Sequence, residues 1–184
     1  VGTRFPKVPV HVEFFESPQD VLDEDALIFY ATKRAGIVIL NHDDEEMMAY
    51  RESIEQDVLT YGMKPGADVF GFAPEILYDA MTNKPSGMIF KVLYKNEEAI
   101  ITIKNALGLQ HVYPALASVA LGLSEGIQLK DIVKLLAAHN TPPGRMKIIE
   151  GNKDTLLIDD TYNASPVAME QAIVTMSTIK KMES

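Results

Sequence analysis

The chain has 184 residues, of which 47% are hydrophobic and 23% charged, and its formal net charge is −9. This is enough apolar material for one domain with a sizeable core. The negative charge argues against a general nucleic-acid or anionic-membrane partner, because both select for basic surfaces. It does not exclude a nucleotide pocket, since a few local cations and backbone amides suffice to bind phosphates.

The chain contains no cysteine. Disulfide frameworks, thiolate catalysis and zinc–thiolate sites are therefore excluded, and the composition fits a cytoplasmic location. No apolar run reaches the roughly 18 residues needed to span a bilayer. The first residues, VGTR, include no initiator Met and no secretion signal, so we interpret the chain as an internal segment of a longer protein.

The first third of the sequence predicts an α/β segment over residues 1–62. Ser17-Pro18 is a good helix start, and the helix is expected to run to about Lys33. Residues 37–40 form a short, continuous apolar run that is typical of a buried parallel strand, and the polar residues 41–44 end it. Residues 45 to about 61 are expected to form a second helix, stopped by Gly62.

An antiparallel subsheet is predicted over residues 68–105. Its clearest element is a hairpin, in which the apolar runs 87–94 and 99–104 are joined by the polar residues 95–98. The whole pattern predicts an α/β fold, with a parallel sheet flanked by helices and this small antiparallel subsheet.

The remaining residues, 108–184, are predicted to form helices plus a hairpin. Helices are expected over residues 113–123 and 129 to about 139, and again after Ser165-Pro166; the hairpin pairs residues 146–149 with 156–158. The helix periodicity predicts two buried faces. In the helix over residues 113–123, the predicted buried face consists of Leu116, Val119, Ala120 and Leu123. In the last helix, it consists of Met169, Ala172, Ile173 and Met176.

The strongest candidate for a ligand site is the end of the apolar strand 156–158. Asp159 and Asp160 follow it at once, then Tyr162 and Asn163, just before a helix. Ligands of open α/β sheets bind beyond the carboxyl ends of the strands, where these groups can hold a ribose and a base. The alternative is that the Asp and Asn side chains only form turns and caps.

Arg145 and two histidines are further candidates. Arg145 follows Pro142-Pro143-Gly144, and its guanidinium can grip phosphate oxygens; a solvated loop arginine is the alternative. His11 lies at a strand-to-loop edge and can ligate a metal, and His111 lies at a helix start, which favours anions. A packing role remains open for both histidines. No segment matches the phosphate-binding pattern G-x-x-x-x-G-K-S/T, so we expect no phosphoryl transfer from this chain unaided.

These motifs, in this order, resemble the Mur ligase family. The segments that carry the resemblance are GRM at 144–146, IDDTYNASP at 158–166, QHVYPALA at 110–117, PVHVEFFES at 9–17 and GIVILNHDD at 36–44. They cover nearly the whole chain. The I-D-D-x-Y-N-A-x-P pattern is most similar to the branch that adds D-alanyl-D-alanine to a UDP-muramoyl tripeptide.

The resemblance implies part of a central, ATP-binding domain. In this family a carboxylate is activated by ATP and Mg²⁺ as an acyl phosphate, and an amine then attacks it to form an amide. By this resemblance Arg145 contacts the phosphates in a catalytic role, and Asp159 or Asp160, with Asn163, contacts the ribose and adenine. His111 is carried over as a nucleotide contact, and His11 as a ligand of Mg²⁺. The implied partners are the UDP-muramoyl peptide and D-Ala-D-Ala, with no nucleic acid and no membrane.

The chain departs from the family pattern in several places. The P-loop, a metal-binding Glu and the C-terminal domain are expected outside it. The family's carbamylated Lys falls on Asp25, whose side chain is shorter, and the usual H-N-x-x-N reads Gln110-His111 with Pro114. Asp25 favours an alternative hypothesis, a non-catalytic Mur-like binding or scaffold module. A third hypothesis, a polyglutamate- or cyanophycin-type synthetase, is disfavoured by the Y-N-A-x-P element.

Overall fold

The computed structural model describes residues 1–5, 14–152, 155–162 and 166–179. Its main sheet has five strands in the order β1-β2-β3-β4-β5. These are β1 (Ile37–Asn41), β2 (Asp57–Gly62), β3 (Val69–Tyr78), β4 (Pro85–Tyr94) and β5 (Glu97–Lys104). β1, β2 and β3 pair in parallel, whereas β3, β4 and β5 pair antiparallel. The predicted class is confirmed, because a parallel sheet continues into an antiparallel subsheet.

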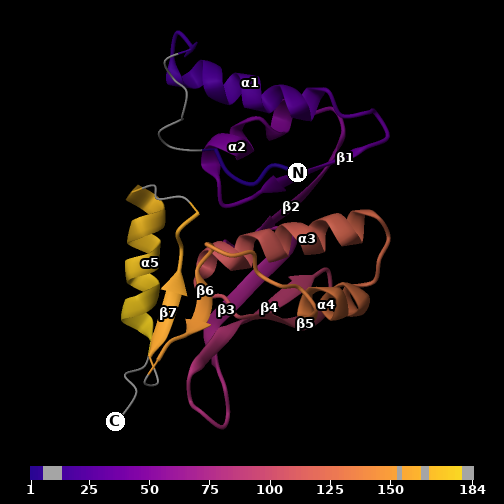
Figure 1. Cartoon of the computed structure of the whole chain (residues 1–184). Coiled ribbons are helices and arrows are strands. Elements are labelled where there is room, and N and C mark those ends of the chain that lie inside the picture. Colours follow the sequence, from indigo (N-terminus) through magenta and orange to yellow (C-terminus); the bar gives the residue numbers. More distant parts are fainter. Residues whose placement is uncertain (6–13, 153–154, 163–165, 180–184) are drawn as a thin grey trace.

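Helices cover both faces of the parallel strands (Figure 1). α3 (Val112–Ser124) packs across β2 and β3, and α4 (Leu129–Ala137) packs along β5. α1 (Pro18–Tyr30), α2 (Glu45–Ala49) and the short helix η2 (Arg51–Ser53) lie at the other end of the molecule, beside β1.

Successive residues of β1 point into two separate cores. Ile39 belongs to the larger cluster, together with Tyr61 and the buried side of α3, whereas Val38 and Leu40 pack with α1 and α2 in the smaller one. A strand with apolar residues at every position is buried on both faces. This confirms the predicted parallel strand, which is buried from Val38 onward, whereas Ile37 at its start is exposed.

The capping of α1 follows directly from its sequence. The Ser17 hydroxyl accepts a hydrogen bond from the Asp20 amide, and the Asp20 carboxylate accepts one from the Ser17 amide, so the two residues form a capping box. Pro18 occupies the first helical position, where its missing N–H costs nothing.

The predicted helix over residues 45–61 is wrong in its second half. The helix ends at Ala49, and residues 57–62 form β2, which pairs in parallel with β1. The segment ends in Val58, Leu59, Thr60 and Tyr61, residues that favour strands. Pairing beside β1 also supplies backbone hydrogen bonds along the whole segment, so tertiary contacts decide its conformation.

β3 is a strand of the subsheet that the sequence analysis does not predict individually, and it contains Pro74. The structure places this proline at a β-bulge: the register to β4 shifts between Phe72 and Glu75, and Ala73 has φ 49°. A proline is tolerated in a strand at such a bulge, where no ladder hydrogen bond is required of it. The predicted hairpin that follows is confirmed as β4 and β5.

A second, two-stranded sheet joins the main body through residues 105–107. β6 (Lys147–Glu150) and β7 (Leu156–Asp159) form the predicted hairpin. The Leu107 amide donates to the Met146 carbonyl at 3.1 Å, and the Ile148 amide donates to the Asn105 carbonyl at 3.0 Å. These bonds fix the hairpin beside η3 (Leu109–His111) and the start of α3.

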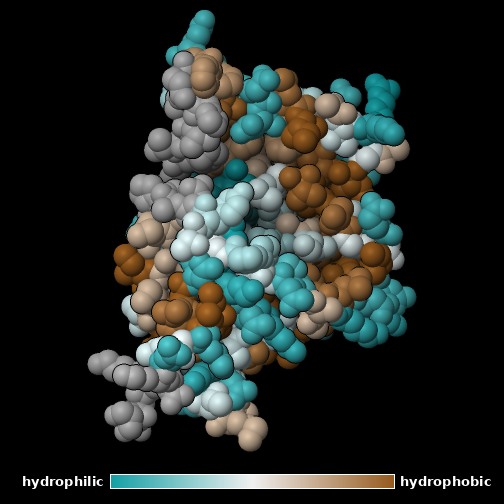
Figure 2. All heavy atoms as spheres, viewed as in Figure 1, coloured by the Kyte–Doolittle hydropathy of each residue, from teal (hydrophilic) through white to brown (hydrophobic). Residues whose placement is uncertain are grey.

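The predicted buried stripe of the last helix, α5 (Pro166–Thr178), is wrong for three of its four residues. Met169, Ile173 and Met176 are more than half exposed. Ala172 is partly buried and packs against the larger core, and Thr175 is buried as well. α5 runs at the edge of the molecule beside the β6–β7 hairpin (Figure 1). Figure 2 shows hydrophobic side chains gathered along that same edge. Periodicity identified an apolar face, but only the neighbouring elements determine which face is covered.

No described helix is both long and apolar enough to cross a bilayer.

We predict that Leu116→Ala lowers the free energy of unfolding by about 2–5 kcal/mol, because it opens a cavity in the larger core. Leu116 is fully buried and packs on Gly71. A Cβ at position 71 would lie 2.6 Å from a leucine methyl. Leu121 lies on the same helix and is 47% exposed, so Leu121→Ala is the matched control, with an expected loss of about 1 kcal/mol or less. Urea denaturation measures both values, and equal losses would contradict the assignment of the buried face.

Candidate nucleotide site

The loop that carries Arg145 lies against the acidic end of β7. The Gly144 amide donates to Asp159 Oδ2 at 3.0 Å, and the Met146 amide donates to Asp160 Oδ1 at 3.1 Å. In return, the Tyr162 amide donates to the Gly144 carbonyl at 3.1 Å. The structure therefore brings together the two elements that the sequence analysis singled out, although they are separated by the whole hairpin.

Both carboxylates have a local structural role. Besides the Gly144 amide, Asp159 accepts hydrogen bonds from the amide and the hydroxyl of Thr161. These bonds hold the pKa of the Asp159 carboxyl below its usual value, with the Thr161 hydroxyl the largest cause and the Gly144 amide the next. The turn role that the sequence analysis left open is thus present. It does not remove the ligand role, because both residues remain only partly buried at the strand end.

Gly144 is required by the shape of this contact. Its φ is +72°, a conformation that L side chains rarely adopt, and a Cβ there would lie 2.9 Å from the Tyr162 nitrogen. The close approach of the two backbones therefore depends on a residue without a side chain. It sets the direction in which Arg145 leaves the loop.

The guanidinium of Arg145 stacks on the ring of Tyr162, with 3.8 Å between Cζ and the ring centroid. Tyr162 is 70% exposed and Arg145 is exposed as well. A stacked guanidinium keeps its N–H groups free at the edges, so the pair presents a cation and an aromatic face side by side. A guanidinium can bind phosphate oxygens, and an aromatic face can stack on a base.

His111 reaches the same loop from η3. Its Nε2 lies 2.9 Å from the Arg145 carbonyl oxygen. Burial lowers the pKa of His111 below its usual value, opposed by the contact with that carbonyl and by the charge of Asp160. The contact with the Arg145 carbonyl supports a role in positioning the loop, and the role of His111 as a nucleotide contact stays a prediction.

Two buried oxygen atoms near this site have no hydrogen-bond partner within the described part of the chain. They are Oε1 of Gln110, in η3, and Oγ1 of Thr141, just before the Arg145 loop. The sequence analysis identified Gln110 only as a departure from the family pattern and did not single out Thr141. Polar atoms left unsatisfied at a site are candidates for ligand contacts.

Two predicted site residues, His11 and Asn163, are outside the described residues. Asp25 is exposed on α1. In the ranges that the structure describes, no group of three or more His, Asp or Glu side chains is arranged to hold a metal ion, so the Mg²⁺ site remains a prediction.

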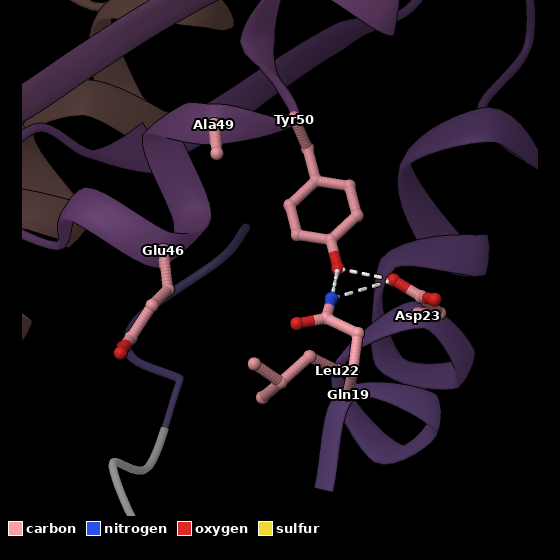
Figure 3. A pocket seen from close by; sticks show the side chains of 6 residues that line it. All are labelled: Gln19, Leu22, Asp23, Glu46, Ala49 and Tyr50. Atoms are coloured by element: carbon pink, nitrogen blue, oxygen red, sulfur yellow. Dashed lines mark hydrogen bonds between the residues drawn. The ribbon is translucent and has the colours of Figure 1, made fainter. Parts of the chain in front are cut away.

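The pocket in Figure 3 is separate from this site. It lies between α1 and α2, has a volume of about 240 Å³, and is lined by Gln19, Leu22, Asp23, Glu46, Ala49 and Tyr50. The Tyr50 hydroxyl donates to Asp23 Oδ1 at 2.5 Å and accepts from the Gln19 amide at 2.8 Å. This network joins the two helices around the smaller core.

The comparisons with known proteins identify the family of the chain. Residues 8–122 match the family model described as "Mur ligase middle domain". The chain belongs to the Mur ligase family. The match itself ends before the Arg145 loop, so the site residues rest on the geometry described above.

Two curated relatives show how much of a Mur ligase the chain represents. It is 28% identical over 178 residues to a UDP-N-acetylmuramoyl-L-alanyl-D-glutamate–2,6-diaminopimelate ligase of Geobacillus thermodenitrificans, covering 93% of this chain and 34% of the relative. It is 27% identical over 170 residues to a UDP-N-acetylmuramoyl-tripeptide–D-alanyl-D-alanine ligase of Buchnera aphidicola, covering 92% and 35%. The chain thus spans about a third of the length of these relatives.

Solved structures share the fold. MurF from Acinetobacter baumannii superimposes with a TM-score of 0.76 at 27% identity, over 91% of this chain and 35% of that one. MurF from Thermotoga maritima, solved in complex with ADP, gives 0.75 at 20% identity over 96% and 39%. The fold of a Mur ligase middle domain is thereby established for this chain.

We predict that Gly144→Ala destabilises the chain more than Gly126→Ala. Both positions have positive φ, which costs an alanine about 1–2 kcal/mol, but a Cβ at Gly126 meets nothing within 4 Å. The difference between the two unfolding free energies in urea isolates the contact with Tyr162. Equal losses in the two variants would show that the loop does not depend on that close approach.

We also predict that Tyr50 and Tyr113 ionise only at high pH. In both residues, burial and a hydrogen-bonded carboxylate together raise the pKa to about 12. Because the folded pKa lies above the usual value of 10, the stabilisation is complete below pH 10 and is lost as the pH rises to about 12. Ultraviolet titration of the phenolates in the chain and in Tyr50→Phe measures this. If the phenolate signal lost in Tyr50→Phe is one that ionises near pH 10, the prediction is wrong.

Proposed function

We propose that this chain is the nucleotide-binding part of an ATP-dependent ligase that acts on peptidoglycan precursors. The observation that carries the proposal is the contact between the Arg145 loop and the acidic end of β7. It places a cation, an exposed aromatic ring and two carboxylates together at one strand end. Membership of the Mur ligase family supports it.

In the proposed reaction, ATP activates a substrate carboxylate as an acyl phosphate, and an amine displaces the phosphate to form an amide. Arg145 stabilises the negative charge that develops on the phosphoryl oxygens. Asp159 or Asp160, with Asn163, contacts the ribose and adenine. We propose that His11 ligates Mg²⁺, and that the P-loop is supplied by a part of the protein outside this chain.

The exposed ring of Tyr162 fits this arrangement as a surface on which the adenine can stack. On binding phosphate, the guanidinium keeps its stacked position and uses its free edge, so the cation needs little reorganisation. The His111 contact with the Arg145 carbonyl restrains the loop backbone at the same time.

We propose D-alanyl-D-alanine as the amine substrate and UDP-N-acetylmuramoyl tripeptide as the acid. The I-D-D-T-Y-N-A-S-P sequence at residues 158–166 and the Buchnera relative support this choice. The Geobacillus relative supports the other candidate, a ligase for 2,6-diaminopimelate. Phosphate release by the full-length protein with each amine in turn distinguishes the two.

A non-catalytic Mur-like binding module remains the second candidate. Its support is Asp25, which occupies the position of the family's carbamylated lysine and is exposed on α1. Such a module would bind nucleotide without amine-dependent phosphate release. The same assay therefore separates the two functions.

We predict that Arg145→Ala lowers the amine-dependent phosphate release of the full-length protein by about 10²-fold or more, because a phosphate-stabilising cation is lost. The fold is retained, since the guanidinium is exposed. Arg51→Ala, which removes an exposed arginine of η2, is the matched control and leaves turnover unchanged. Unchanged turnover in Arg145→Ala would remove this residue from the site.

A further inference from the structure

Asp43, at the carboxyl end of β1, joins three parts of the fold. Its Oδ2 accepts hydrogen bonds from the Met63 amide at 2.7 Å and from the Tyr113 hydroxyl at 2.9 Å. Its Oδ1 accepts one from the Lys64 amide at 2.9 Å. One carboxylate therefore binds the loop after β2 and the first turn of α3 together.

The carboxylate lies where only a glycine at position 62 leaves room for it. A Cβ on this glycine would lie 2.4 Å from Asp43 Oδ1. The Asp43 amide also donates to Asn41 Oδ1 at 3.0 Å, so the backbone turn after β1 is fixed too. Asp43 has little freedom to move, which makes it a rigid acceptor for Tyr113.

This bond ties the first turn of α3 to Asp43, at a helix start that also packs into the larger core through the buried Val112 and Leu116. The N-cap residue of α3 is His111, and its side chain makes no capping hydrogen bond to the helix. Tyr113 is in the first turn, and its hydroxyl remains a donor throughout the physiological range, since Asp43 and burial raise its pKa to about 12. A hydroxyl-to-carboxylate bond is charge-assisted and stronger than a neutral one.

From α3 the contacts continue to the candidate site. Two residues before Tyr113, His111 contacts the Arg145 carbonyl at 2.9 Å, and the flanking amides of that loop are bound by Asp159 and Asp160. Hydrogen bonds and the two residues of chain between Tyr113 and His111 thus connect the loop after β1 with the carboxyl end of β7. A shift of the α3 start would move His111 and loosen one of the contacts that hold the loop.

We propose that Asp43 and Tyr113 are positioning residues that set where His111 and the Arg145 loop lie relative to the carboxyl ends of the parallel strands. The identity of the ligand held by that loop rests on the proposed function; the positioning itself does not. Neither residue contacts the nucleotide in this proposal. The sequence analysis left Tyr113 unassigned and identified QHVYPALA only as a family motif.

The test is an NMR titration of the His111 ring in the chain, in Tyr113→Phe and in the control Tyr50→Phe. Both substitutions remove a hydroxyl donor to an aspartate, but only the first is connected to the site. In Tyr113→Phe the ring loses burial, so we expect the pKa of His111 to rise toward its usual 6.5. In Tyr50→Phe it stays where it is in the unsubstituted chain.

The charged groups that act on His111, namely Asp160, His139 and Arg145, are intact in all variants. Gly62→Ala is a second route to the same result, since it displaces Asp43 without touching α3. A His111 pKa that is unchanged in both Tyr113→Phe and Gly62→Ala overturns the proposal. Thermal unfolding measures the loss of stability in each variant. If Tyr50→Phe shifts the His111 pKa as much as Tyr113→Phe does at equal destabilisation, loss of stability alone explains the shift and the proposal is also overturned.

The consequence for function is measured separately in the full-length protein. We expect Tyr113→Phe to raise the KM for ATP about 5-fold, the equivalent of one hydrogen bond of roughly 1 kcal/mol, with a smaller change in kcat. Turnover by the unsubstituted protein that does not depend on ATP would refute the proposed function, and the His111 titration would still decide the positioning. An unchanged KM together with a shifted His111 pKa would overturn the link between positioning and nucleotide binding.

Discussion

The candidate site depends on two carboxylates that accept backbone amides from a distant loop. Asp159 and Asp160 accept hydrogen bonds from the amides on either side of Arg145. These two bonds fix the backbone from which the exposed Arg145 side chain extends. The contact requires Gly144, because only a residue without a Cβ lets the two backbones approach in this conformation. The position of Arg145 over Tyr162 follows from it.

Around this contact the fold is organised by the carboxyl ends of its strands. β1 ends at Asn41 and is followed by Asp43, and β7 ends in Asp159. Each of these aspartates uses its carboxylate on backbone amides of another segment, and Asp43 also on the Tyr113 hydroxyl. In this fold, polar side chains at the strand ends fix neighbouring loops. The loop held by Asp159 carries Arg145, the group suited to bind a ligand.

The sequence predicted most elements correctly where a local signal was strong. Ser17-Pro18 began a helix because cap and first-turn preferences are local, and the β4–β5 hairpin followed from two apolar runs and a polar turn. Local signals failed where the environment overrode them. β2 is a strand because β1 lies beside it. α5 packs against the larger core through Ala172, which leaves Met169, Ile173 and Met176 exposed.

By itself the sequence determined the family, the fold class and the pairing of Arg145 with the acidic segment after Ile158, because these are encoded in short motifs with fixed order. Only the tertiary structure decided what holds that pair together. Three kinds of contact do so: the hydrogen bonds donated by the Gly144 and Met146 amides, the stack of Arg145 on Tyr162, and the Asp43–Tyr113 hydrogen bond. They join residues that are 14 to 70 positions apart. Contacts over such separations depend on how strands and helices pack, which no local pattern of residues specifies.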